Sequence, residues 1–213
     1  HLSIRRQRQM CIRDSLSGPH VPFSVESIVD VCLEERVPIL STFWGDPTPF
    51  VARAHAVGVK VIDQVGSVAD ALRAARAGVD VIIAQGVEAG GHIAGNVTTM
   101  ALVPRVVDSV APIPVVAAGG IADARGFVAA LALGAQGAVI GTRLIATPEA
   151  YAHPVYKQKV LDANEDQTVR TTLFGFGWPN APHRTLRTPF VEHWLPEEAR
   201  GSCLLYTSDA ADE

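Results

Sequence analysis

The sequence predicts an α/β fold in which short parallel strands alternate with crossover helices. Three observations lead to this fold class. Short runs rich in Val and Ile are bounded by Gly or Pro, as expected for buried strands. Stretches with apolar residues at helical spacing lie between these runs. The strand candidates begin roughly 20 to 35 residues apart, which is the spacing of βα units in a parallel sheet.

Five buried strands are predicted along the chain. Each is short, apolar and closed at one or both ends by a residue that favours a turn. Runs that are apolar on both faces are typical of parallel strands covered by helices, rather than of exposed antiparallel strands. We expect the strands over residues 37–44, 59–65, 79–85, 114–119 and 137–141.

Six helices are predicted around these strands. Ser24, Ser67 and Asp123 precede three of them, where a side-chain oxygen can accept from free N–H groups of the first turn. Gly78 and Gly134 end two of them, as glycine often does after a helix. We expect the helices over residues 25–35, 48–56, 67–77, 98–110, 123–133 and 150–163.

The composition excludes several classes of protein. The 213 residues suit one domain, and 48% hydrophobic with 19% charged residues is a globular composition. A net charge of -4 predicts no nucleic-acid partner, and no apolar run is long enough for a membrane span. Three cysteines without metal or disulfide spacing, and no export signal, predict a cytoplasmic protein without a metal site. The sequence leaves homo-oligomer formation open.

The two ends differ from the rest of the chain. Residues 1–15 hold four arginines without an apolar period, and residues 201–213 show neither a helix nor a strand pattern. Both resemble translated sequencing-adaptor sequence, and ordinary disordered termini are the alternative. We therefore predict non-native or disordered ends there, and place the folded unit in residues 16–200.

The number of strands points to an incomplete barrel. A TIM-type (β/α)8 barrel needs eight strands and usually about 250 residues, whereas five strands are predicted here. The chain is then either part of such a barrel, with about strands 4–8 present, or an open doubly wound sheet. The glycine loops described next favour the barrel, and the residues after the last strand would form a C-terminal cover of helices and loops.

Two glycine-rich loops follow the last two predicted strands. Gly119 and Gly120 end the fourth strand and open a helix, and Gly141 with Thr142 ends the fifth. In (β/α)8 barrels the loops after the last strands commonly bind phosphate, because glycines and helix N-termini present N–H groups to the anion. Two such loops in succession favour a phosphate site, although the glycines could serve only as tight turns.

A third loop, residues 84–95, follows the strand at 79–85 and carries polar groups. Gln85 can both donate and accept hydrogen bonds at the edge of a heterocycle. Gly90 and Gly91 allow close approach of a flat ligand to the backbone. His92 can take or give a proton near neutral pH, although a lone histidine is often structural. Glu88 is a helix-end or supporting carboxylate.

These three motifs together resemble the nitronate monooxygenase family, formerly called 2-nitropropane dioxygenases, over residues 25–194. Flavin-type enoyl-ACP reductases are close relatives of that family. The resemblance implies a (β/α)8 barrel with FMN at the carboxyl ends of the strands, and His92 as the active-site histidine. It also implies that the family's first strands are missing. The implied FMN-binding residues are Gln85, Gly90, Gly91, Gly119, Gly120, Val139, Ile140, Gly141 and Thr142.

The resemblance further implies the reaction and its rivals. FMN would oxidise a nitronate or nitroalkane with dioxygen to a carbonyl compound and nitrite, while His92 stabilises the anion or removes the α-proton. Rivals are an NAD(P)H-dependent reductase of a quinone or enoyl thioester, and a truncated remnant that binds flavin weakly. A nucleotide dehydrogenase is disfavoured, because no cysteine lies on a strand-end loop. For His183 and Trp178, in the C-terminal stretch, we expect a structural role in covering the barrel.

Overall fold

The computed structural model describes residues 9–13, 24–174 and 180–200. Its main body is a six-stranded parallel sheet in the order β1-β2-β3-β4-β6-β7. These strands are Gln9–Arg13, Ile39–Phe43, Lys60–Val65, Val81–Gln85, Val115–Ala118 and Gly137–Val139. Neighbours in the sheet follow one another along the chain, as in a barrel, whereas a doubly wound sheet reverses its order.

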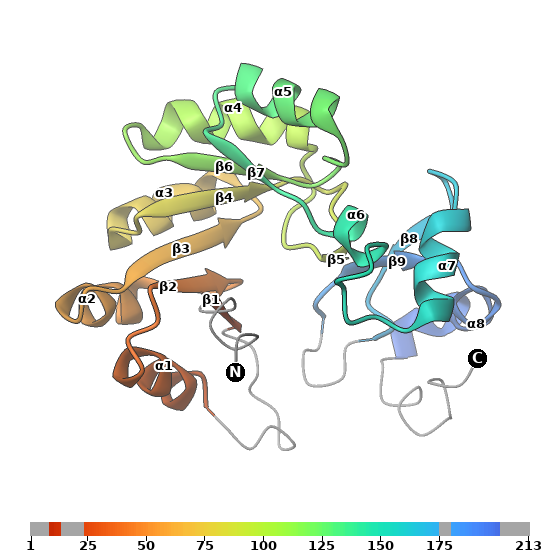
Figure 1. The fold of residues 1–213 in the computed structure, drawn as a ribbon, viewed down its shortest axis with the longest axis horizontal. Coiled ribbons are helices and arrows are strands. Elements are labelled where there is room, and N and C mark those ends of the chain that lie inside the picture. Colours follow the sequence, from red (N-terminus) through yellow and green to blue (C-terminus); the bar gives the residue numbers. More distant parts are fainter. Residues whose placement is uncertain (1–8, 14–23, 175–179, 201–213) are drawn as a thin grey trace.

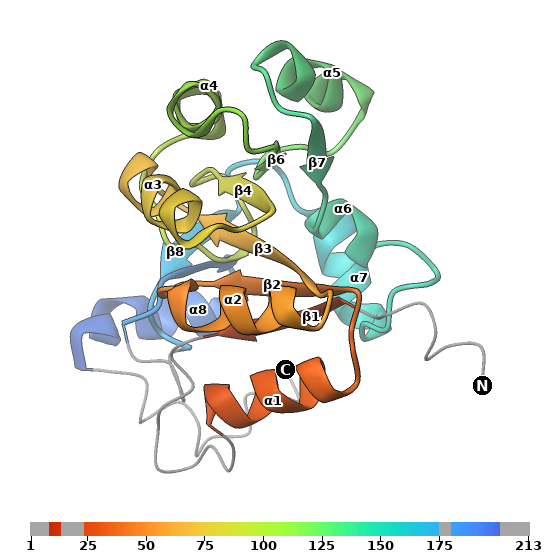
Figure 2. The ribbon, with the colours of Figure 1, turned by 90° about the vertical axis from the view of Figure 1, so that its left-hand side faces the viewer.

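Five helices cover one face of this sheet. They are α1 (Val25–Glu34), α2 (Thr48–Ala56), α3 (Val68–Ala77), α4 (Thr99–Val110) and α5 (Ala124–Ala132). The strands follow an arc with these helices on its outer side (Figure 2), and the carboxyl ends of the strands point to the C-terminal part of the chain (Figure 1). The molecule is therefore part of a (β/α) barrel, as the sequence predicted.

The predicted helix ends are confirmed by the hydrogen bonds of their caps. Ser24 Oγ accepts from Ser27 N at 3.1 Å, and Ser67 Oγ accepts from Asp70 N at 3.1 Å. Such a bond satisfies an N–H group that has no partner inside the helix. Gly78 ends α3 with a φ of 88°, a left-handed conformation that favours glycine.

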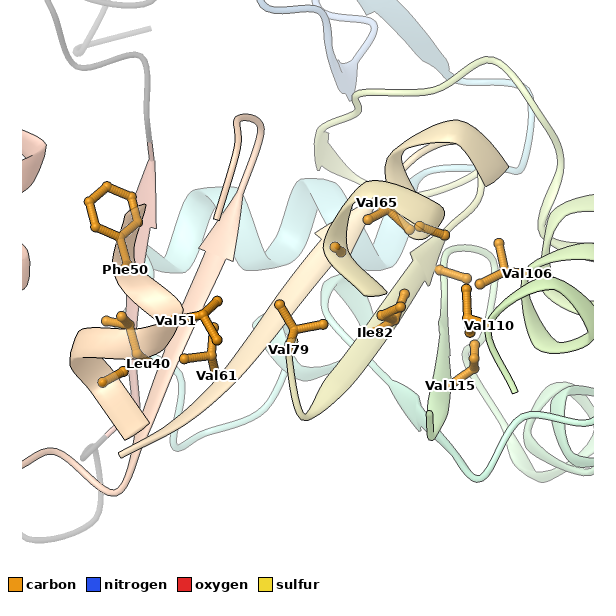
Figure 3. Packing of buried hydrophobic residues seen from close by; sticks show 14 of the residues in the cluster. Leu40, Phe50, Val51, Val61, Val65, Val79, Ile82, Val106, Val110 and Val115 are labelled. Atoms are coloured by element: carbon orange, nitrogen blue, oxygen red, sulfur yellow. The ribbon is translucent and has the colours of Figure 1, made fainter. Parts of the chain in front are cut away.

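The core lies between the sheet and these helices (Figure 3). Leu40, Val61 and Ile82 point from three neighbouring strands toward the helices and are wholly buried. Val51 of α2 and Val106 of α4 meet them from the helical side. Burying such side chains stabilises the fold by about 1.5–3 kcal/mol each, so this layer fixes where the strand ends lie.

Three sequence predictions need correction. The sheet has six strands and not five. The additional strand, Gln9–Arg13, pairs in parallel with Ile39–Phe43 and lies within residues 1–15, for which no strand was predicted. The strand predicted over 137–141 ends at Val139, since β7 pairs with β6 alone over three residues. The helix predicted over 150–163 begins only at Pro154, behind the cap residue His153.

The C-terminal cover contains a small sheet as well as helices. Its antiparallel strands have the order β5-β9-β8, with bounds Gly91–His92, His183–Leu186 and Thr168–Thr171. The helices of the cover are α6 (Thr142–Ile145), α7 (Pro154–Asp162), α8 (Pro189–Trp194) and the 3-10 helix η1 (Leu195–Arg200). The sequence predicted only helices and loops here, since these strands are short and polar. Among the described residues, no helix has the length and apolar character needed to cross a membrane.

Candidate active site

The three glycine loops meet at the carboxyl ends of β4, β6 and β7. A Cβ on Gly119 would lie 2.9 Å from the carbonyl oxygen of Gly86, and one on Gly120 would lie 3.3 Å from Cβ of Glu88. A Cβ on Gly90 would lie 2.5 Å from Oγ1 of Thr142. A side chain at Gly119 would therefore meet backbone, whereas one at Gly120 or Gly90 would require the side chain of Glu88 or Thr142 to move. Gly119 and Gly120 also have φ values of 100° and 70°, which glycine adopts most easily.

Glu88 holds two of these loops to the start of α4. Its carboxylate accepts from Thr99 N at 2.9 and 3.1 Å, and thus occupies a free N–H group of the helix. Thr99 Oγ1 lies 3.1 Å from the same carboxylate and 2.9 Å from the carbonyl oxygen of Gly119. Of the two roles that the sequence left open, the helix-end role is the one these contacts describe.

Gln85, the last residue of β4, is buried, and its side-chain amide forms a hydrogen bond through Nε2. Its Nε2 donates to the backbone oxygen of His92 at 2.9 Å, which ties the far end of the loop to the strand. Its Oε1 is buried and accepts no hydrogen bond from the residues that the structure describes. A buried acceptor without a donor costs about 1–3 kcal/mol, and is an expected feature of a site that binds a hydrogen-bond donor.

The loop between β6 and α5 has its own helix cap. Asp123 accepts from Arg125 N at 3.0 Å and from Gly126 N at 3.2 Å, so two N–H groups of the first turn are already bonded. Hydrogen bonds from Arg125, and from the backbone of Gly126, hold the pKa of Asp123 below its ordinary value. An anion at this loop would therefore be bound by N–H groups that precede the helix, near Gly119 and Gly120, and by those around Thr142.

The second half of the expected phosphate site has the geometry of a turn into a short helix. Gly141 precedes α6, and Thr142 is the first residue of that helix. Val139 and Gly141 are exposed and Ile140 is half-buried, so this segment is accessible to a ligand. Thr142 meets the Gly90 loop, which brings all three predicted motifs into one region.

His92 lies on β5, directly after Gly91, whose φ is 74°. Its ring faces Trp44 with a centroid separation of 6.5 Å and a T-shaped arrangement. It also faces His183, with a centroid separation of 5.5 Å. The sequence placed His92 on a loop, whereas the structure holds it in the small antiparallel sheet, and that pairing fixes its backbone.

Sequence reasoning missed several residues that shape this region. Trp44 directly follows β2 at its carboxyl end, and its place as the last residue of the strand predicted over 37–44 was an available signal. Arg184 donates to the carbonyl oxygen of Val87 at 2.9 Å, and Arg170 donates to Asn96 and Ile93. These contacts join segments that are far apart in the chain, so no local sequence pattern predicts them. Trp178 lies outside the described residues.

Two ionisable groups of the cover, His183 and Glu198, have shifted pKa values, and His183 lies next to His92. Burial lowers the pKa of His183, against the opposing effects of the Ala181 backbone and the negative charge of Glu198. Burial acts to raise the pKa of Glu198, but hydrogen bonds from Thr172 and Thr171 outweigh it and leave that pKa below its ordinary value. His183 is thus biased toward its neutral form, and Glu198 toward its charged form.

Comparisons with known proteins agree on one family. The family model described as nitronate monooxygenase matches residues 11–211. A relative from Mycobacterium tuberculosis is 40% identical over 166 residues, covering 77% of this chain and 45% of its own length. It is named a dehydrogenase of a hydroxylated methyl-oxo-octahydro-indene-carboxyl-CoA. The chain spans about half the length of the curated relatives it matches.

Solved structures give the same result for the fold. FabK from Thermotoga maritima superposes with a TM-score of 0.81 at 42% identity, over 93% of this chain and 62% of that one. Nitroalkane oxidase from Streptomyces ansochromogenes superposes with a TM-score of 0.74 at 32% identity, over 81% of this chain and 52% of that one. The match of the family model over nearly the whole sequence, together with the three glycine motifs, shows that the chain belongs to the nitronate monooxygenase family.

Proposed function

We propose that this protein is an FMN-dependent oxidoreductase that oxidises nitronates and nitroalkanes with dioxygen, giving a carbonyl compound and nitrite. The observation that carries the proposal is the convergence of the three glycine loops beside Gln85 and His92 at the carboxyl ends of the strands. Family membership and the similarity to a nitroalkane oxidase support it. The small-molecule substrate and dioxygen are the partners that this reaction requires.

The residues present fit FMN. The buried Oε1 of Gln85 is an acceptor that a ring N–H of the flavin would satisfy. Gly90 and Gly91 carry no side chains and would let the backbone approach the flat ring system closely. The phosphate would be held by backbone N–H groups of the two later loops, at Gly119, Gly120, Val139, Ile140, Gly141 and Thr142. When bound, FMN supplies reversible transfer of one or two electrons between substrate and dioxygen.

His92 would handle the proton of the substrate. A neutral nitroalkane must lose the proton on its α-carbon before it can be oxidised, and an imidazole can take that proton near neutral pH. A nitronate has already lost this proton, so with that substrate His92 would act only as a donor to the bound anion. The two substrates therefore separate proton removal from the steps that follow it.

The test is His92→Asn in the FMN-loaded protein, assayed with nitroethane and with ethyl nitronate. General-base catalysis is typically worth about 10² to 10⁴ in rate, so we expect that loss for nitroethane and a much smaller loss for ethyl nitronate. His153→Asn is a matched control, because His153 caps α7 in the cover and is exposed. Unchanged turnover of nitroethane would overturn the assignment of His92 as the base.

A second candidate function is that of a flavin-dependent NAD(P)H reductase of a quinone or enoyl thioester. The relative named as a dehydrogenase of a CoA derivative, 40% identical to this chain, favours it because its name points to a thioester substrate. Anaerobic mixing distinguishes the two functions. Bleaching of the flavin absorbance by ethyl nitronate supports nitronate oxidation, whereas bleaching by NADH or NADPH alone supports the reductase.

A further inference from the structure

We propose that His183 is a positioning residue for His92: its neutral ring orients the His92 ring and stabilises the protonated form of His92 after proton transfer from the substrate. This role rests on the proposed function, since it concerns the proton that His92 would take. The sequence assigned His183 only to covering the barrel.

The small sheet places the two rings together. His92 on β5 is the direct partner of His183 on β9, and Thr171 on β8 is the direct partner of His183 on its other side. Residues directly opposite in an antiparallel ladder share one face of the sheet. The two imidazole centroids are 5.5 Å apart with planes tilted by 47°, so the rings are direct neighbours.

His183 is enclosed on the side away from His92. Phe174 packs edge-on against its ring, with centroids 5.2 Å apart. Its Nδ1 is buried and makes no hydrogen bond of good geometry with the described residues. The burial that lowers the pKa of His183 also disfavours a second positive charge next to His92. We therefore infer that the pair carries one proton at a time, and place that proton on His92, because burial disfavours a charge on His183.

The charges around the pair are consistent with a single positive charge on it. Glu198 of η1 accepts from Thr171 Oγ1 at 2.9 Å and from Thr172 Oγ1 at 3.0 Å, and its negative charge acts on His183. Arg184 and Arg170 belong to the adjacent row of the ladder, whose side chains point to the other face. Beyond Trp44, a small cavity is lined by the charged residues Asp63, Asp70 and Arg73.

The chemistry of imidazole gives the pair its function. A protonated imidazole has two N–H donors and no acceptor, whereas a neutral imidazole keeps one acceptor nitrogen. A neutral His183 can therefore accept from protonated His92, which favours the protonated form of His92 and restrains its ring. A phenyl ring would fill the same space without an acceptor, while a glutamine would keep a carbonyl acceptor.

The experiment compares His183→Phe and His183→Gln with the parent chain by NMR titration of the His92 imidazole. With His183→Phe, we expect the midpoint of the His92 titration to fall by about one unit, because protonated His92 would lose the acceptor that we propose on His183. Turnover of nitroethane should fall about tenfold, and turnover of ethyl nitronate should stay unchanged. With His183→Gln, the acid dissociation constant of His92 and the turnover of nitroethane should each stay within about threefold of the parent value. His193→Phe, an exposed histidine of α8, is the matched control.

An unmoved His92 titration in His183→Phe would overturn this role, and so would an equal loss with both substrates. If His183→Phe does not fold, Glu198→Gln replaces it: that variant removes the negative charge near the pair, and should lower the His92 midpoint too. The failure of the proposed function has a separate signature, because the parent protein would then turn over neither nitro compound while the NMR titration still reports on the pair.

Discussion

The side chain of Thr142 lies directly against the backbone of Gly90. A Cβ at Gly90 would stand 2.5 Å from Thr142 Oγ1, closer than nonbonded atoms approach. The loop after β4 and the turn after β7 are thus in contact, although β6 separates their strands in the sheet. This contact lies in the region where the predicted flavin residues meet, and a side chain at residue 90 would force the Thr142 hydroxyl or the loops to move.

Gly90→Ala is expected to push these two loops apart. Overpacking of this kind typically costs about 1–3 kcal/mol, which would weaken FMN binding roughly tenfold to a hundredfold. The measurement is the dissociation constant for FMN, from the quenching of flavin fluorescence. The double variant Gly90→Ala with Thr142→Ala removes the clashing oxygen and should recover most of the affinity.

Gly137→Ala is the matched control for this test. It makes the same change on β7, where a Cβ would meet only ordinary van der Waals contacts at 3.9 Å. FMN affinity should remain at the parent value in this variant. Equal weakening by the two single variants would show that the Gly90 contact has no special part in binding.

The elements that the sequence predicted well are those whose signals are local. α3 is an example, because Ser67 and Gly78 mark its two ends by cap chemistry alone. The glycine motifs were also readable, because consecutive glycines directly after a buried strand are a local pattern in the sequence. The strands of the cover were not predictable in this way. β9 exists because His183 and Arg184 pair with both β5 and β8, and such long-range pairing leaves no pattern in a four-residue segment.

The candidate site shows the same division between local and distant information. Gln85 and His92 were predicted as site residues because they lie at the end of one strand and in the loop after it, but the hydrogen bond from Gln85 to the His92 backbone was not predicted. Their partners Trp44 and His183 come from opposite ends of the chain. A histidine in a polar stretch is most often structural, so only the folded arrangement singles out His183.

Gln85→Met tests the buried amide. Methionine has nearly the same length but neither accepts nor donates as an amide does. The variant loses the bond to the His92 backbone, worth about 0.5–1.5 kcal/mol, together with the acceptor that we propose for the flavin. We expect FMN to bind at least tenfold more weakly, and the visible spectrum of any bound flavin to shift. Gln136→Met, an exposed position before β7, should change neither property.

Arg184→Lys tests how the cover supports the loop after β4. The guanidinium donates to the Val87 carbonyl at 2.9 Å and to Thr168 Oγ1 at 3.1 Å, a fork that lysine cannot reproduce. Loss of about 1 kcal/mol of such bonding should make the amides of residues 86–92 exchange several-fold faster with deuterium. Arg187→Lys, in the same cover, contacts Thr168 and Glu192 and should leave that exchange unaltered.

Asp80→Asn tests a charged cluster at the opposite end of the sheet. Asp80 accepts from Lys60 Nζ at 2.7 Å and from Val61 N and His55 Nε2 at 2.8 Å, so it joins α2, β3 and β4. At neutral pH we expect the free energy of unfolding to fall by about 1–2 kcal/mol. Asp30→Asn is the control, since its pair with Arg53 is exposed on both sides.

The pH dependence of the Asp80 variant follows from the direction of its shift. Burial acts to raise the pKa of Asp80, but the bonds from Lys60, Val61 and His55 outweigh it and keep it below 3.8. A carboxyl group whose pKa is lowered in the folded state stabilises the fold fully at pH values above its ordinary, unfolded pKa. That stabilisation is lost as the pH falls through the lowered, folded pKa. The gap between parent and variant in urea unfolding should therefore be constant near neutrality and shrink below about pH 4.

His183 predicts a stability change in a higher pH window. Burial lowers its pKa from 6.5, so between 6.5 and the lowered value the unfolded chain binds more protons than the folded one. Stability then rises with pH across that window and is lost as the pH falls. The contribution of Glu198 lies lower, because its pKa is depressed from 4.5. Thermal midpoints of the parent and of His183→Gln should therefore converge, or cross, between pH 7 and pH 5. A constant difference across that range would mean that His183 has the same charge in the folded and unfolded chains, which its burial beside His92 argues against.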